Sequence, residues 1–87
     1  MPRVFLQPQL RDLTDGAAEV VAEGKTLRQV IASLDRAHPG LAARLVQNDQ
    51  LAAGIAVSID GVITARGLLA QVRDHSEIHF LPAIGGG

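Results

Sequence analysis

Apolar and polar residues alternate along three short segments of the chain, and this period of two is typical of strands with one buried face. In the first segment Val4 and Leu6 share a face. Pro8 and Pro82 follow the first and the last segment, where the missing N–H group limits further pairing. The pattern predicts strands over residues 3–7, 55–59 and 77–81.

Two turn signals add further strands. Asp60-Gly61 suits a two-residue type I′ turn, in which both central residues have positive φ, so residues 62–64 are expected to return as a partner strand. Asp15-Gly16 also indicates a turn, and the extended apolar run at 17–23 follows it. The runs over 10–16 and 17–23 are expected to form an antiparallel hairpin, although the alanine and glutamate content of the second run would also permit a helix.

One helix is expected in the middle of the chain. The segment Thr26–Gln29 fits a capping box, in which the threonine hydroxyl accepts from the third helical amide and the glutamine reaches back. The next apolar residues form one stripe at helical spacing: Leu27, Val30, Ile31 and Leu34. His38-Pro39-Gly40 ends the helix, because proline disfavours a helical residue before it and glycine permits a left-handed turn. Residues 41–46 are expected to add a short helical turn.

The order of elements is strand, strand, helix and three further strands. It predicts an α+β domain of two layers, with one main helix packed across a mixed sheet of about four to five strands. The expected common core comprises Leu27, Ile31, Leu34, Val57, Ile59, Ile78 and Phe80. We expect a single domain over residues 1–84 and a flexible glycine tail over 85–87, since glycine is costly to order and brings no side chain.

Composition narrows the classes of function. The 87 residues carry a formal net charge of −1 without runs of one sign, and only 2% are aromatic, which argues against nucleic acid as a partner. The absence of cysteine excludes disulfides, thiolate metal sites and cysteine nucleophiles. No apolar stretch approaches the roughly 20 residues of a membrane span, and no signal peptide pattern precedes the first strand. We therefore expect a cytoplasmic protein without a membrane partner.

Other reactive groups do not combine into a site in the sequence. His75 and His79 lie about 13 Å apart along a strand, too far to share a metal ion, so both are interpreted as exposed. Ser58 and Asp60 lack the glycine-flanked turn of a serine nucleophile, and no glycine-rich loop has the residues of a phosphate site. Lys25, the only lysine, is interpreted as a solvated residue before the helix. We expect no catalytic residue, bound cofactor or metal in this chain.

The end of the chain is the most informative segment, because three of the nine glycines are its last three residues. A frayed terminus or a cloning remnant is the plain alternative, but the glycines follow an expected strand closely and no tag residues accompany them. An extended end without Cβ atoms can enter a narrow channel and present its carboxylate to the active site of another protein. The hypothesis is that this terminal carboxylate is the reactive group.

Three motifs point to one family: Phe80-Leu-Pro-Ala-Ile-Gly-Gly-Gly87, His38-Pro-Gly-Leu41 and Thr26-Leu27. With these motifs the whole chain resembles the ubiquitin-like sulfur carriers. That family includes the small subunit of molybdopterin synthase, the thiamine-pathway carrier and the actinobacterial cysteine-pathway carrier. The resemblance implies a β-grasp fold.

The resemblance also implies a function. In the family a ubiquitin-activating-type adenylyltransferase uses ATP and magnesium to adenylate the C-terminal carboxylate. A sulfur donor protein then converts it to a thiocarboxylate, which serves a recipient synthase in molybdopterin, thiamine, cysteine or specialised metabolite synthesis. The modified residue would be Gly87, and Gly85 and Gly86 would enter the partner's active site with it. The outer sheet face and the root of the tail would bind partners through His79, Leu81, Pro82 and Ile84.

The sequence departs from the family pattern at two positions. Asp74-His75-Ser76 stands where relatives commonly have Asp-Gly-Asp, so a non-glycine residue occupies a position where positive φ is expected. Ala83 stands where ubiquitin has an arginine, which favours a bacterial-type activating enzyme over a ubiquitin-specific one. Two alternatives stay open: a ubiquitin-like modifier that forms isopeptide bonds through Gly87, and an interaction module whose tail has no role.

Overall fold

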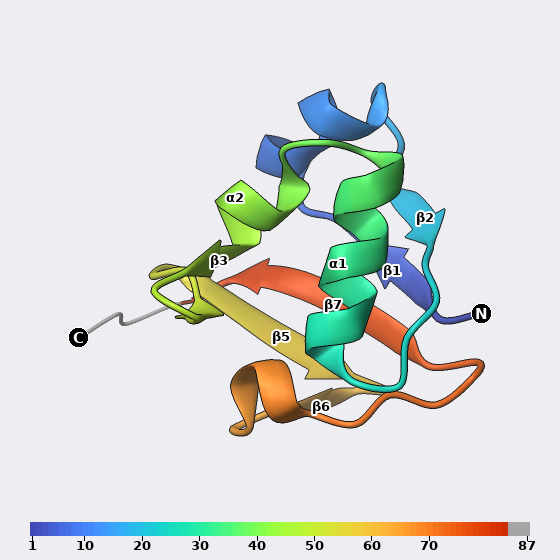
Figure 1. Cartoon of the computed structure of the whole chain (residues 1–87), viewed down its shortest axis with the longest axis vertical. Helices are drawn as coiled ribbons and strands as arrows, with labels where there is room; N and C mark the ends of the chain where they lie inside the picture. The colour runs from blue at the N-terminus through green and yellow to red at the C-terminus, as the bar shows by residue number, and fades with distance from the viewer. Residues whose placement is uncertain (84–87) are drawn as a thin grey trace.

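The structure is a computed structural model that describes residues 1–83. A five-stranded sheet has the order β2-β1-β7-β5-β6 (Figure 1). Its strands are β1 (Arg3–Phe5), β2 (Glu19–Val21), β5 (Ile55–Ile59), β6 (Val62–Ile63) and β7 (Glu77–Pro82). Strands β1 and β7 run parallel, and the other neighbours run antiparallel. The last strand of the chain is therefore the central strand of the sheet.

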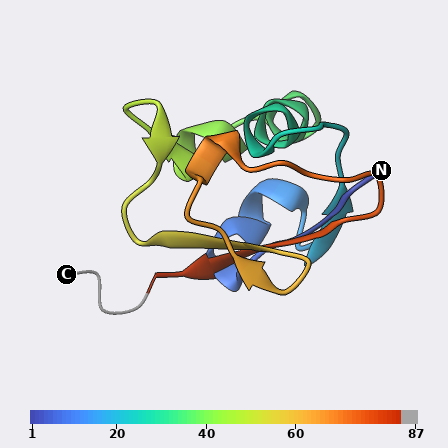
Figure 2. The same ribbon diagram turned by 90° about the horizontal axis from the view of Figure 1, so that it is seen from below.

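The helices form a second layer. Figure 2 shows the sheet edge-on, with the two α-helices together on one side of it. The remaining elements are α1 (Leu27–Ala37), α2 (Leu41–Leu45), the short strands β3 (Val46–Gln47) and β4 (Gln50–Leu51), and the 3-10 helices η1 (Pro8–Thr14) and η2 (Gly67–Leu69). This arrangement confirms the predicted α+β fold with one main helix across a mixed sheet.

Helix α1 begins and ends where the sequence predicts. The Thr26 hydroxyl accepts a hydrogen bond from the Gln29 amide at 3.3 Å. The Gln29 side chain, however, accepts from the Lys25 amide at 2.9 Å, one residue before the position that a capping box uses. At the other end Gly40 has φ +105°, and the Asp35 carboxylate accepts from its amide at 3.1 Å. Asp35 thereby fixes the short connection to α2.

The core lies between α1 and the sheet. Six of the seven predicted core residues are buried together: Leu27, Ile31, Leu34, Val57, Ile78 and Phe80. The seventh, Ile59, was predicted to be buried but is only partly buried, at the margin of the core. Its cross-strand partner is Val62, which is 67% exposed and lies on the two-residue edge strand β6. An edge strand this short leaves Ile59 without cover on one side.

Near the N-terminus the elements are shorter than predicted. Val4 and Leu6 are both buried, as the alternation indicates, but β1 ends at Phe5. Residues 8–14 form η1, which begins at Pro8 because proline favours the first turn of a helix and lacks the N–H that a strand needs. The strand predicted over 17–23 is confirmed as β2, with a shorter extent. Its predicted hairpin with the run over 10–16 is wrong, because residues 8–14 form η1 and β2 pairs antiparallel with β1 instead.

The turns include one that the sequence analysis missed. Asp60 and Gly61 have φ +52° and +85°, which fits the predicted type I′ hairpin between β5 and β6. Asn48 and Asp49 likewise have φ +51° and +60° and join β3 to β4. Two-residue strands carry no readable alternation, so the Asn-Asp pair was the only local signal for this hairpin.

Candidate functional site

Strand β7 leads the chain through the middle of the sheet to its C-terminal residues. It pairs with β5 along its whole length, from Ile59 opposite Ile78 to Ile55 opposite Pro82. The Ala83 amide then donates to the Gly54 carbonyl at 2.9 Å. The point at which the chain leaves the sheet is therefore fixed by main-chain bonds to the β5 side.

The beginning of β7 is held by one carboxylate in the β5–β6 turn. Asp60 Oδ1 accepts from the Glu77 amide at 2.9 Å, and Oδ2 accepts from the Ser76 hydroxyl at 2.8 Å. The Ser76 oxygen in turn accepts from the Arg73 amide at 2.9 Å. The bond from the Glu77 amide, followed by that from Ser76, holds the pKa of Asp60 below its usual range.

The same contacts explain the turn at Asp74-His75-Ser76. Positive φ was expected there for a non-glycine residue, but none of these three residues has positive φ. The turn is closed by the Ser76 amide, which donates to the Arg73 carbonyl at 3.1 Å, and by the hydroxyl contacts of Ser76. His75, at the position of the expected glycine, is exposed, and the buried Ser76 next to it provides the contacts that close the turn.

The outer face of the sheet, opposite α1, carries an aromatic stack. The rings of Phe5 and His79 are parallel within 6° with centroids 4.4 Å apart. The Arg3 guanidinium lies 5.4 Å from the Phe5 centroid and pairs with Glu77 at 3.0 Å. His79 is half-buried by this stack, so its interpretation as exposed was wrong, whereas His75 is exposed. The parallel pairing of β1 with β7 places Phe5 beside His79.

The predicted partner-binding residues lie at the end of this face. Leu81 is half-buried and Pro82 is exposed. By the alternation of β7, Leu81 lies on the same outer face as His79, whereas Ile78 and Phe80 lie on the core side. Two hollows meet at His79 and Leu81, one toward Gln7 and Pro82, the other toward Ser58 and Asp60. The role of these residues in partner binding stays a prediction.

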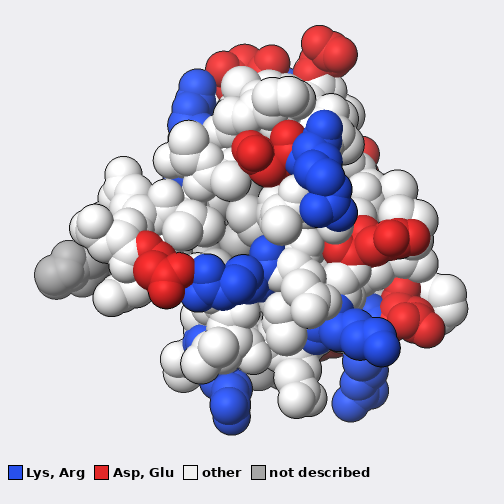
Figure 3. Space-filling model, in the orientation of Figure 1, with Lys and Arg blue, Asp and Glu red and all other residues white. Residues whose placement is uncertain are grey.

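Ile84, Gly85, Gly86 and Gly87 lie outside the described residues. Within residues 1–83 no three His, Cys, Asp or Glu side chains come together in a way that could hold a metal ion. No helix in this part of the chain is long and apolar enough to cross a membrane. Figure 3 shows acidic and basic side chains interspersed over the face that it presents.

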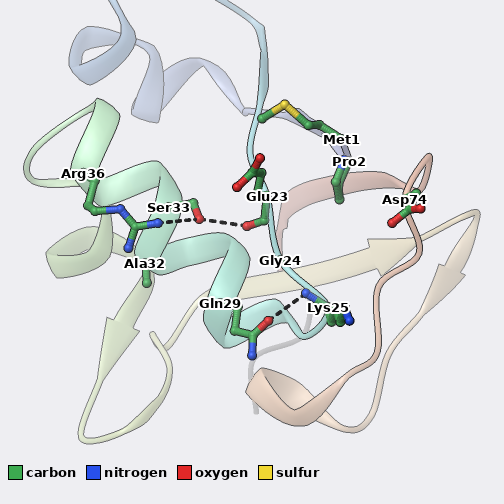
Figure 4. Close-up of a pocket in the computed structure, with 10 residues that line it drawn as sticks. All are labelled: Met1, Pro2, Glu23, Gly24, Lys25, Gln29, Ala32, Ser33, Arg36 and Asp74. Carbon is green, nitrogen blue, oxygen red and sulfur yellow. Dashed lines mark hydrogen bonds between the residues drawn. The ribbon is translucent and has the colours of Figure 1, made fainter.

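A further hollow lies on the α1 side of the molecule, between the N-terminus, α1 and Asp74 (Figure 4). Three of its polar side chains, those of Gln29, Ser33 and Arg36, make hydrogen bonds within the chain. The Ser33 hydroxyl donates to the Glu23 carbonyl at 2.8 Å and accepts from Arg36 at 3.1 Å. Lys25 lines this hollow and is exposed, in agreement with its interpretation as a solvated residue. This arrangement offers no nucleophile with an adjacent base.

Sequence reasoning missed Arg3 as a neighbour of the beginning of β7, and Phe5 and Gln7 as neighbours of its last residues. Their proximity depends on the parallel pairing of the first strand with the last, between residues more than seventy positions apart. No local pattern in the sequence indicates that pairing.

The fold, with β7 at the centre of the sheet, defines a class of protein. A helix across a five-stranded sheet, with a parallel central pair formed by the first and last strands, is the β-grasp fold of ubiquitin-like proteins. The chain belongs to the ThiS family, which matches residues 4–87. This match, together with the structural relatives, confirms the predicted family of ubiquitin-like sulfur carriers.

Solved structures agree with this assignment. A chain of the BexX/CysO complex from Amycolatopsis orientalis is 32% identical, with a TM-score of 0.91 and 100% of both chains covered. Mycobacterium tuberculosis CysO, an antigen, is 26% identical with a TM-score of 0.89, covering 97% of this chain and 100% of its own. Small archaeal modifier protein 1 from Methanosarcina acetivorans is 27% identical with a TM-score of 0.77, over 99% and 95%. No curated protein matches the sequence.

Proposed function

We propose that this protein carries sulfur as a thiocarboxylate on Gly87 and delivers it to a biosynthetic enzyme. The observation that supports the proposal most strongly is the ThiS family match, which extends to the last residue and so includes the terminal glycines. The anchored end of β7 is consistent with this role. A chain extended from Pro82 to Gly87 reaches about 20 Å, enough to enter the active site of a protein that docks beside it.

The chemistry requires one displacement at the α-phosphorus of ATP and a second at the terminal carboxyl carbon. In the first, a carboxylate oxygen attacks the α-phosphorus of ATP, which forms the acyl-adenylate and releases pyrophosphate. In the second, sulfide (HS⁻) supplied by the donor attacks the acyl carbon and forms the C–S bond of the thiocarboxylate, and AMP leaves with the original carboxylate oxygen. The activating enzyme would supply ATP, magnesium and the stabilisation of developing charge. The carrier would supply only its carboxylate, and it would bind no cofactor of its own.

Three kinds of partner follow from this proposal: an adenylyltransferase of the ubiquitin-activating type, a sulfur donor protein and a recipient synthase. The structural relative from Amycolatopsis orientalis was crystallised in a complex with BexX, which supports an enzyme partner for this chain as well. We place the contacts on His79, Leu81, Pro82 and Ile84. The reaction depends on ATP, and we expect it in the cytoplasm.

Intact-mass analysis of protein purified from its own host tests the proposal. The expected result is a species heavier by the replacement of one oxygen with sulfur, located on the last peptide. A variant that lacks Gly87 is the control, and it should show no such species and no adenylate. Its thermal stability should match the wild type, because glycine brings no side chain to the core. An adenylate on a chain with residues added after Gly87 would contradict the proposal.

A second function has a specific observation in its favour. The similarity to small archaeal modifier protein 1 supports a ubiquitin-like modifier that uses the same adenylate to form isopeptide bonds. Lys25 is the only lysine and is exposed, so chains of this protein linked through a lysine would use it. Abundant Lys25-linked species, lost in Lys25→Arg, would favour the modifier over the carrier. Unlinked protein with a thiocarboxylate would favour the carrier.

A further inference from the structure

A shallow hollow lies beside the end of β7, on the side where β1 no longer accompanies it. The ladder between the two strands ends at Phe5 and His79. Strand β7 continues to Pro82 with β5 alone as its neighbour. Gln7 and Pro8 line the opposite wall of the hollow, since the chain turns away from the sheet there to begin η1. The last part of β7 therefore has an open edge.

This open edge offers hydrogen-bond acceptors. Alternate residues of a strand direct their main-chain groups to the same side, and the Ser76 carbonyl accepts from the Arg3 amide on the β1 side at 2.9 Å. By this alternation Phe80 and Pro82 also direct their carbonyls toward β1. Within residues 1–83 the Phe80 carbonyl receives no main-chain bond from Gln7, which is the position that would continue the ladder. Pro82 has no N–H to offer.

The Gln7 side chain adds an unpaired amide to the same hollow. Its Oε1 is buried and has no hydrogen-bond partner among the described residues. The main-chain carbonyl of Gln7, in contrast, accepts a hydrogen bond from the Leu10 amide at 3.0 Å. Buried amide oxygens in native proteins are nearly always paired, and leaving one unpaired is destabilising. A residue that weakens the free protein in this way is a candidate for a contact made only in a complex.

The remaining lining restricts the kind of ligand. Among the described residues, Arg11 is the only arginine, lysine, aspartate or glutamate of the lining, and its Nε already donates to the Leu6 carbonyl at 3.0 Å. Phe5, Leu81 and the two prolines contribute apolar surface. A ligand that matches this hollow must donate hydrogen bonds to amide oxygens and present small apolar groups. An extended polypeptide main chain has both properties.

We propose that this hollow binds an extended segment of the activating enzyme, which lies along the open edge of β7 and donates a main-chain N–H to Gln7 Oε1. The inference rests on the proposed function, because an enzyme that holds the terminal glycines must pass this end of β7. The segment adds a short strand beside Phe80 and Pro82, where β1 has ended. It thereby holds the root of the tail in an extended form.

The proposal requires opposite effects of one substitution on stability and on binding. Gln7→Leu keeps the side-chain size but removes the unpaired amide, so the melting temperature of the free protein should stay equal or rise. The same change removes an acceptor for the enzyme, so the dissociation constant should rise roughly tenfold. Gln50→Leu, at an exposed glutamine in β4, is the matched control and should leave affinity unchanged.

The test uses the full-length carrier and the activating enzyme purified from the same host. Titration calorimetry gives the affinities, and pyrophosphate release measured against carrier concentration gives the KM for adenylation, which Gln7→Leu should raise and Gln50→Leu should leave unchanged. In the wild-type carrier, the side-chain amide resonances of Gln7 should shift when the enzyme is added, whereas those of Gln50 should not. The resonance measurement needs no variant.

The outcomes separate this inference from the proposed function. A Gln7→Leu variant that melts lower than the wild type, or binds the enzyme equally well, overturns the hollow as a binding site while adenylation of the wild type still supports the carrier role. An unshifted Gln7 side-chain resonance in the complex overturns it as well. Wild-type carrier that binds the enzyme and shifts the Gln7 resonance, yet is never adenylated, supports the hollow and contradicts the proposed function.

Discussion

Asp60 and Glu77 are joined by two hydrogen bonds in opposite directions. The Asp60 amide donates to the Glu77 carbonyl at 2.9 Å, and the Glu77 amide donates to Asp60 Oδ1, also at 2.9 Å. One residue of the β5–β6 turn therefore fixes the first residue of β7. Because β7 is the central strand of the sheet, this pair joins the β5–β6 turn to the middle of the fold.

Replacement of Asp60 should destabilise the fold. Asp60→Ala removes the acceptors for Glu77 and Ser76 and places alanine at φ +52°, where side chains other than Asn and Asp are disfavoured. We expect a loss of about 1–2 kcal/mol in the free energy of unfolding. Asp60→Asn, which tolerates this φ and keeps one acceptor oxygen, should lose less. Chemical denaturation of both variants checks the expectation, and equal losses would contradict the assigned role of the carboxylate.

The Asp60 carboxylate should also make stability depend on pH. Hydrogen bonds from Glu77 and Ser76 lower its pKa in the folded state below the ordinary value of about 3.9. A lowered folded-state pKa means that this stabilisation is present above the unfolded pKa and is lost as the pH falls through the folded one. Because Asp60 is exposed, the effect should be small. As the pH is lowered below about 5, the melting temperature should therefore fall less steeply for Asp60→Asn than for the wild type. An equal pH dependence of the two melting temperatures would contradict the interpretation.

Local sequence patterns predicted the elements whose residues are close along the chain. The capping residue Thr26, the apolar stripe of α1 and the Asp60-Gly61 turn are all of this kind, and the structure confirms them. The contact of Phe5 with His79 and that of Asp60 with Ser76 join distant segments, so periodicity could not indicate them. The predicted faces of β7 were correct, but the degree of exposure of His79 depended on a neighbouring strand. The terminal glycines were evident in the sequence alone.

Gly24 should tolerate alanine less well than Gly54. Both have positive φ, +155° and +83°. A Cβ on Gly24 would lie 2.6 Å from the Val30 main-chain nitrogen, whereas a Cβ on Gly54 would meet nothing within 4 Å. Gly54→Ala should therefore cost only the unfavourable backbone conformation, about 1–2 kcal/mol. Gly24→Ala should cost about 1–3 kcal/mol more, because the start of α1 must shift. Urea denaturation gives both values, and similar losses would show that the close approach is relieved easily.

Phe80 should contribute more to stability than any exposed apolar residue of the sheet. Its side chain is 1% exposed and lies in the core from the central strand. Phe80→Ala should lower the free energy of unfolding by roughly 3–5 kcal/mol, since the cavity cannot close fully. Val62→Ala, at a residue that is 67% exposed on the edge strand, is the control and should cost well under about 1 kcal/mol. An unchanged denaturation midpoint for Phe80→Ala would contradict the described packing of β7.

Leu81 should be a contact for both the activating enzyme and the recipient enzyme. It lies on the outer face, pairs with Ala56 and is the last apolar side chain of that face before Pro82. A protein that accepts the chain end within the reach of six extended residues must cover this position. If Leu81 becomes buried on binding, Leu81→Asp should weaken each complex by roughly 1–3 kcal/mol.

The control for Leu81→Asp is Val62→Asp, which places the same charge on an exposed apolar residue of the edge strand β6. Thermal unfolding of both variants should first establish that the fold is retained, because Leu81 is half-buried in the free protein. Titration calorimetry with each enzyme should then show weaker binding for Leu81→Asp and unchanged binding for Val62→Asp. Equal affinity of the wild type and Leu81→Asp would place the docking surface elsewhere. A loss with Val62→Asp of similar size would instead attribute the effect to net charge, since the added carboxylate is the only change the two variants share.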